Sequence, residues 1–309
     1  MAQLKSDFPS GLIVPIATPI TADERVAETE LRRLVDFLID GGVDALFALG
    51  TTGEVGALTD DERARILEIV IDAAANRVPV IAGVSAEGTI RVIRAIERLS
   101  VYGPDALAAT PQYYAQAQSQ SELVTFYRTI MAATDLPFIL YNIPVITGIT
   151  MAPETVAELA AIDNCVGLKA GASQLDYFQS LINQPGVKDN IRLLQGGEHL
   201  LLPSLLIGGD GGLNGIANLA PGLFASLLDA WRRGDLDEAQ RCHRKVVALA
   251  DIVYSSGENI FSVIKGGLSL LGLGDNRACS PSPPASDAVL QRLKPLLSHS
   301  CSGHEDADG

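Results

Sequence analysis

The 309-residue sequence predicts an α/β protein, a (β/α)8 TIM barrel followed by a C-terminal α-helical extension. Short apolar runs alternate eight times with longer segments that carry apolar residues at helical spacing, about thirty residues per unit. The apolar runs are continuous, which is typical of parallel strands covered by helices. Eight such units suit a closed barrel, although an open, doubly wound sheet remains the alternative for this pattern.

The elements follow from local signals. The first unit joins the apolar run Leu12–Thr18 to a helical pattern at Thr29–Leu38, which Gly41 and Gly42 terminate. Before the helix predicted at 60–75, Thr59 is an N-cap residue, and Glu62 completes a capping box. The other strands are expected at 43–49, 78–84, 106–110, 138–141, 166–170, 191–194 and 211–216, and the other helices at 89–99, 122–133, 153–159, 175–182, 199–207 and 223–231.

The alternation stops after Gly234, where three further helical patterns cover 236–254, 259–271 and 286–297. We therefore expect a catalytic barrel at residues 1–234 and a helical extension at 235–298. The last segment, 299–309, is rich in Ser, Gly and Asp, and its composition predicts a disordered tail.

Composition excludes several classes of protein. With 47% hydrophobic and 19% charged residues the chain is globular. A net charge of −14 without a dense Lys/Arg cluster argues against binding to nucleic acid or an anionic membrane. The longest apolar run, 200–207, is far shorter than the ~20 residues of a membrane span, and no signal peptide is evident, so a cytoplasmic protein is predicted. The four Cys and four His are scattered without ligand spacing, so neither a metal nor a disulfide framework is expected.

Lys169 is the most informative candidate for chemistry. In a barrel, reacting groups lie at the carboxyl ends of strands and in the loops that follow. Lys169 lies within the apolar strand 166–170, in a chain with only six lysines. Burial favours the free amine, which can attack a ketone to form a Schiff base. The alternative is a lysine whose stem packs while its ammonium reaches the barrel mouth.

Other candidates follow neighbouring strands. The loop Gly50-Thr51-Thr52-Gly53-Glu54 offers two hydroxyls and several backbone N–H groups that could hold a carboxylate, although an ordinary turn has a similar composition. Tyr113 and Tyr141 follow or end two strands, where a phenol could move protons or simply pack.

Two further charged sites are less informative. Glu198 and His199 follow the seventh strand, but no further ligand at the right spacing supports a metal there. Lys265 lies in the predicted extension, where packing is the favoured interpretation.

Four motifs in order carry a resemblance: Gly50–Glu54, Pro111-Gln112-Tyr113-Tyr114, Tyr141-Asn142-Ile143-Pro144 and Gly167-Leu168-Lys169. Together they resemble the dihydrodipicolinate synthase / N-acetylneuraminate lyase family of class I, pyruvate-dependent aldolases. The match extends from Gly11 to about Leu297.

The resemblance implies a role for each matched residue. Lys169 is the Schiff-base lysine, Tyr141 shuttles protons, and Thr51 and Tyr113 complete the relay. Thr51 and Thr52 bind the pyruvate carboxylate, and the family needs no cofactor. A tyrosine such as Tyr113 reaches a neighbouring subunit, which implies a homotetramer built as a dimer of dimers. The remaining substrate-binding positions are Gly50, Gly53, Gly196, Glu198, Gly215 and Ile216.

Departures from the family pattern bear on the substrate. Ile146 stands where the synthases carry an arginine that binds the carboxylate of the aldehyde substrate, which argues against lysine-pathway synthase activity. Gly171, Gly215 and the pair Glu198-His199 depart from the sialic-acid lyases. We therefore expect a lyase that cleaves or condenses a 2-keto-3-deoxy sugar acid, or a similar 4-hydroxy-2-oxo acid, to pyruvate and an aldehyde. A dehydratase or deaminase acting through the same iminium, and a non-catalytic barrel that binds a 2-oxo acid, remain alternatives.

Overall fold

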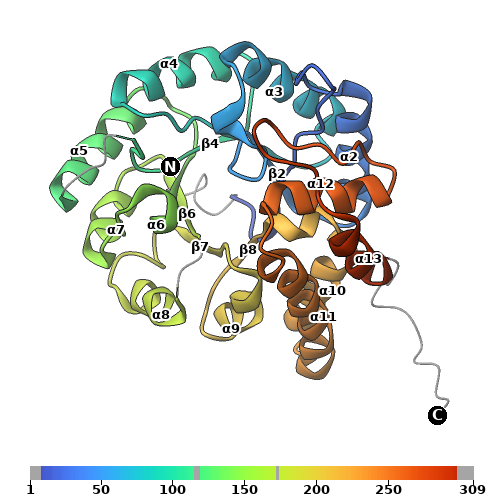
Figure 1. The fold of residues 1–309 in the computed structure, drawn as a ribbon. Coiled ribbons are helices and arrows are strands. Elements are labelled where there is room, and N and C mark those ends of the chain that lie inside the picture. The colour runs from blue at the N-terminus through green and yellow to red at the C-terminus, as the bar shows by residue number, and fades with distance from the viewer. Residues whose placement is uncertain (1–7, 115–118, 172–173, 298–309) are drawn as a thin grey trace.

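The computed structural model describes residues 8–114, 119–171 and 174–297, so the predicted tail at 299–309 lies outside the described residues. Eight parallel strands form a closed barrel in sequence order, with helices around it (Figure 1). Because β8 pairs in parallel with β1, the barrel prediction is confirmed and the open sheet is wrong. The strands are β1 (Gly11–Pro15), β2 (Ala45–Ala48), β3 (Val80–Gly83), β4 (Ala106–Ala109), β5 (Phe138–Asn142), β6 (Cys165–Ala170), β7 (Arg192–Gln195) and β8 (Gly211–Leu213).

The helices that follow these strands surround the sheet. They are α2 (Glu28–Asp40), α3 (Asp60–Ala74), α4 (Thr89–Ser100), α5 (Gln120–Met131), α6 (Pro144–Thr147), α7 (Pro153–Ala160), α8 (Leu175–Asn183), α9 (Leu201–Leu206) and α10 (Pro221–Arg232), with short 3₁₀ turns η1 (Val55–Ala57), η2 (Glu198–Leu200) and η3 (Gly215–Asn218).

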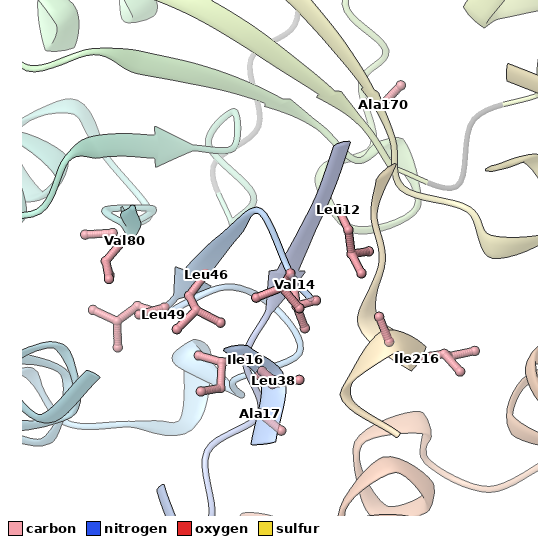
Figure 2. Packing of buried hydrophobic residues seen from close by; sticks show 14 of the residues in the cluster. Leu12, Val14, Ile16, Ala17, Leu38, Leu46, Leu49, Val80, Ala170 and Ile216 are labelled. Carbon is pink, nitrogen blue, oxygen red and sulfur yellow. The ribbon is translucent and has the colours of Figure 1, made fainter. Parts of the chain in front are cut away.

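Alternation along each strand creates two apolar cores. Neighbouring residues of a strand point to opposite faces, so Leu12 and Val14 of β1 belong to the core between sheet and helices, whereas Ile13 belongs to the barrel interior. Figure 2 shows Leu12, Val14 and Leu46 within the outer core. The barrel interior is therefore filled with side chains, and reacting groups are confined to its carboxyl end.

Three local predictions need correction. Thr59 caps α3 as expected, but the Glu62 carboxylate accepts a hydrogen bond from the Val26 N–H at 2.8 Å, so the reciprocal half of the capping box does not form. Strand β8 ends at Leu213, and Ile216 lies in the turn η3. The one-turn helix α6 was not predicted; Pro144 favours it by presetting φ at its first position.

Helices α11 (Leu236–Ser255), α12 (Ile260–Leu270) and α13 (Asp287–Leu297) form the extension and gather on one side of the barrel beside α10 (Figure 1). Helix α12 packs closely, since a Cβ at Gly267 would come within 2.6 Å of the Leu219 side chain. No helix in the described ranges is long and apolar enough to cross a membrane.

Candidate active site

Lys169 and Tyr141 form the centre of the candidate site. They are directly paired neighbours on β6 and β5. Lys169 is 6% exposed, and its Nζ donates a hydrogen bond to the Tyr141 hydroxyl at 3.0 Å. The same nitrogen lies 4.1 Å from the centre of the Tyr141 ring. The lysine is thus held inside the barrel mouth, and its amine does not extend to solvent.

Thr51 continues this contact. Its Oγ1 lies 3.3 Å from the Tyr141 hydroxyl, and either oxygen can donate. The phenol therefore lies between an amine and an alcohol, in a row drawn from three separate βα units. Such a row can carry a proton between the lysine and a bound substrate.

Tyr113 lines a cavity together with Thr51 and Tyr141, and the Glu87 carboxylate lies beside it. Burial, reinforced by the neighbouring Glu87 carboxylate, raises the pKa of the phenol. Within the described ranges, the hydrogen bonds do not join Tyr113 to Thr51 or Tyr141. In the single chain, hydrogen bonds therefore join Lys169, Tyr141 and Thr51, and Tyr113 is not part of this row.

The loop after β2 is a compact turn. The N–H groups of Gly53 and Glu54 donate to the carbonyls of Gly50 and Thr51 at 3.1 and 2.9 Å. Glu54 has a φ of 55°, in the left-handed region that costs a non-glycine residue energy. Surrounding contacts must therefore hold the loop in this form.

Two glycines permit close approach around the predicted carboxylate site. A Cβ at Gly196 would lie 2.9 Å from the Ala170 carbonyl oxygen and 3.2 Å from Cε of Lys169. A Cβ at Gly215 would lie 3.0 Å from Oγ1 of Thr52. The loops after β7 and β8 therefore approach the lysine and the threonine loop.

Glu198 supports this arrangement from behind. Its fully buried carboxylate accepts hydrogen bonds from the Ile216 N–H at 3.1 Å and the Tyr254 hydroxyl at 2.6 Å. His199 instead points to Asp251, at 2.7 Å. Neither side chain lines the cavity beside Tyr141; Glu198 joins the loop after β8 to α11, and His199 contacts α11 alone. The described parts of the chain contain no group of three or more His, Cys, Asp or Glu side chains that could hold a metal ion.

A cavity of about 310 Å³ opens beside Tyr141 and Thr51. Ile146 of α6, the residue expected from the resemblance to stand in place of an arginine, lines it. No lysine or arginine is among its described lining residues, and its walls are mainly apolar. The sequence did not predict the contribution of the extension, which supplies Asn259, Phe261, Cys279, Ser280 and Ser282.

Lys265, for which the sequence favoured a packing role, lies next to this site. Its ammonium pairs with the Glu54 carboxylate, and the two side chains are 2% and 4% exposed. Glu54 lines the cavity, whereas Lys265 lies behind it. An unusual charged residue within the apolar pattern of α12 was the only sequence signal for this contact.

Comparison with known proteins identifies the family. The model of the Dihydrodipicolinate synthetase family matches residues 8–300. The chain is 36% identical over 287 residues to a 4-hydroxy-tetrahydrodipicolinate synthase of Syntrophus aciditrophicus (strain SB), covering 93% of this chain and 97% of that protein. It is 33% identical over 291 residues to the probable 2-dehydro-3-deoxy-D-pentonate aldolase YjhH of Escherichia coli (strain K12), covering 93% and 96%.

A solved structure extends this likeness to the whole fold. YagE, a prophage protein of the dihydrodipicolinic acid synthase family from E. coli K12, solved in complex with pyruvate, superposes with a TM-score of 0.88 at 30% sequence identity. The match covers 94% of this chain and 98% of YagE. The chain belongs to the dihydrodipicolinate synthetase family.

Proposed function

We propose that this enzyme is a Schiff-base aldolase that cleaves, or in reverse forms, a 4-hydroxy-2-oxo acid of the 2-keto-3-deoxy sugar acid class. The products of cleavage are pyruvate and an aldehyde without a second carboxylate. The observation that carries the proposal is the 3.0 Å hydrogen bond from the buried Lys169 amine to the Tyr141 hydroxyl, with Thr51 next in line. No metal or organic cofactor is required for this chemistry.

The reaction begins when the Lys169 amine attacks the C2 ketone; the resulting hydroxyl takes the Tyr141 proton and leaves as water, which forms an iminium and a Tyr141 phenolate. Tyr141, relayed through Thr51, takes the proton of the 4-hydroxyl as the C3–C4 bond breaks. The electron pair of that bond passes to the iminium, which becomes an enamine, and the aldehyde departs. Protonation of the enamine carbon and hydrolysis then release pyruvate and restore the amine.

The substrate carboxylate has a suitable receptor in the loop after β2. The hydroxyls and N–H groups of Thr51 and Thr52 can donate to it, with Gly215 close to Thr52. Gly196 allows the loop after β7 to lie against the stem of Lys169. This arrangement holds a single carboxylate beside the amine.

The rest of the substrate is expected to be uncharged. Ile146 and Phe261 line the cavity, and neither can bind a second carboxylate. The curated relatives include both a 4-hydroxy-tetrahydrodipicolinate synthase and a probable pentonate aldolase. Because Ile146 removes the arginine anchor, we favour the aldolase.

Borohydride reduction in the presence of pyruvate, followed by peptide mass spectrometry, tests the proposal. A reduced pyruvyl adduct on Lys169 is expected. Assays with 2-keto-3-deoxy acids should then yield pyruvate plus an aldehyde, whereas an intact carbon chain would indicate the dehydratase or deaminase alternative. Efficient condensation of pyruvate with aspartate semialdehyde would contradict the assigned substrate class. A folded protein that forms no adduct would favour the non-catalytic barrel.

We also propose a homotetramer. Ile90 and Tyr114 are 67% and 87% exposed, and they are close in sequence to Glu87 and Tyr113. A subunit contact at these residues would cover apolar surface. Sedimentation velocity of the purified protein tests this, and a monomer at micromolar concentration would contradict it.

A further inference from the structure

The ion pair between Glu54 and Lys265 joins the carboxylate loop to the extension. Glu54 is three residues after Thr51, and Lys265 lies on α12. The side chains are 4% and 2% exposed, so water does not compensate either charge. Removal of one partner would leave an uncompensated buried charge, which is strongly destabilising.

Glu54 is held at a second point. Its Oε1 accepts a hydrogen bond from the Cys279 N–H at 2.8 Å. The carboxylate is thereby bound both by α12 and by the segment that precedes α13. Neither Glu54 nor Lys265 has a place in the proton relay or in carboxylate binding as proposed above.

The loop needs such an anchor because its backbone is strained. Glu54 adopts a φ of 55°, a conformation that persists only where surrounding contacts impose it. Its N–H donates to the Thr51 carbonyl at 2.9 Å, so a shift of Glu54 moves Thr51 directly. Thr51 in turn must remain near its 3.3 Å contact with Tyr141.

We propose that Glu54 and Lys265 are positioning residues: α12, acting through this ion pair, holds the loop so that Thr51 stays against Tyr141. The helical extension is then part of the catalytic unit, although it supplies no reacting group. The inference rests on the proposed Schiff-base function, because Thr51 matters only if Tyr141 moves protons.

The test uses the exchange of pyruvate methyl protons with solvent deuterium, followed by NMR, which needs no aldehyde. The double variant Glu54→Gln/Lys265→Met removes both charges at similar volume, a change that buried pairs often tolerate. Its exchange rate per folded subunit should fall about tenfold or more, because small displacements of catalytic groups are costly. Borohydride trapping should still label Lys169.

A double-mutant cycle on the exchange rates separates a positioning effect on Thr51 from a general loss of stability. If the pair acts through Thr51, then adding Glu54→Gln/Lys265→Met to Thr51→Val should lower exchange by no more than about twofold. The control is Lys188→Met, which breaks the partly buried pair with Asp210 at the amino end of β8. It should lower the free energy of unfolding while leaving exchange within about twofold of wild type.

The outcomes distinguish the positioning role from the proposed function. If the wild-type protein exchanges pyruvate protons and the double variant does so equally fast, the positioning role is wrong and the proposed function stands. Additive losses with Thr51→Val, or an equal loss in Lys188→Met, also overturn the positioning role. Absence of exchange and of trapping in the wild-type protein overturns both.

Discussion

The barrel and the extension each bury a lysine near the same cavity, and the two lysines have different neighbours. Lys169 of β6 is 6% exposed, and its amine lies against the hydroxyl and ring of Tyr141. Lys265 of α12 is 2% exposed and faces the Glu54 carboxylate. Lys265 is therefore held in an ion pair with a carboxylate, whereas the Lys169 amine has only a neutral hydroxyl and a ring beside it.

This difference separates reacting from supporting parts of the molecule. The barrel supplies the amine, phenol and alcohol on strand ends and in the loop after β2. The extension supplies contacts to the loops that carry them, through Lys265 to Glu54 and through Tyr254 to Glu198. Substitutions in the barrel should therefore affect chemistry, and those in the extension should affect position and stability.

The largest effect is expected for Lys169→Met. Because the covalent intermediate cannot form, turnover should fall by at least about a thousandfold, and borohydride should trap no pyruvyl adduct. Lys265→Met is the matched control, since adduct formation on Lys169 should persist in its folded fraction. An adduct at Lys265, or undiminished trapping in Lys169→Met, would reverse the assignment of the two lysines.

The second-largest effect is expected for Tyr141→Phe. Loss of the hydroxyl between Lys169 and Thr51 removes the group that transfers protons, and pyruvate proton exchange should fall about a hundredfold or more. Trapping should slow but still label Lys169. A suitable control is Tyr102→Phe, a partly buried residue that packs against the outer core away from the relay. Equal exchange rates in the two variants would remove Tyr141 from the mechanism.

Tyr254→Phe tests the contact between the helical extension and Glu198. The substitution leaves the buried Glu198 carboxylate without the donor now at 2.6 Å, which should cost about 1–3 kcal/mol in the free energy of unfolding. Urea denaturation measures this loss. Exchange per folded subunit should change by less than tenfold, because Tyr254 contacts no reacting group; a larger loss at unchanged stability would contradict a supporting role.

The smallest effect concerns His243 of α11. Burial lowers the pKa of this imidazole from its usual 6.5, so the unfolded chain takes up a proton at higher pH than the folded chain. As pH falls below about 6.5, protonation therefore favours unfolding, and stability decreases through the lowered folded pKa. In His243→Gln, Tm should decrease less steeply between pH 7.5 and 5. Parallel curves would show that His243 does not contribute.

Much of the candidate site could be predicted because strand position selects it. Lys169, Tyr141 and Thr51 were found from strand ends and the rule that barrels react at the carboxyl edge. The neighbours of the Tyr113 and Glu198 side chains could not be predicted. Each neighbour, Glu87 and Tyr254 respectively, comes from another part of the chain. The contact of Glu54 with Cys279 spans 225 residues, and no local pattern encodes it.

The barrel and its helical extension could be predicted from the sequence, and so could the candidate reacting groups, because periodicity and strand ends are local properties of the chain. The folded arrangement was needed to show which buried lysine faces a phenol and which a carboxylate, and that α12 contacts the loop bearing Thr51. The physical reason is that the contacts of a buried ionisable side chain determine its energy. Those contacts come from residues that are distant in the sequence and adjacent only in the fold.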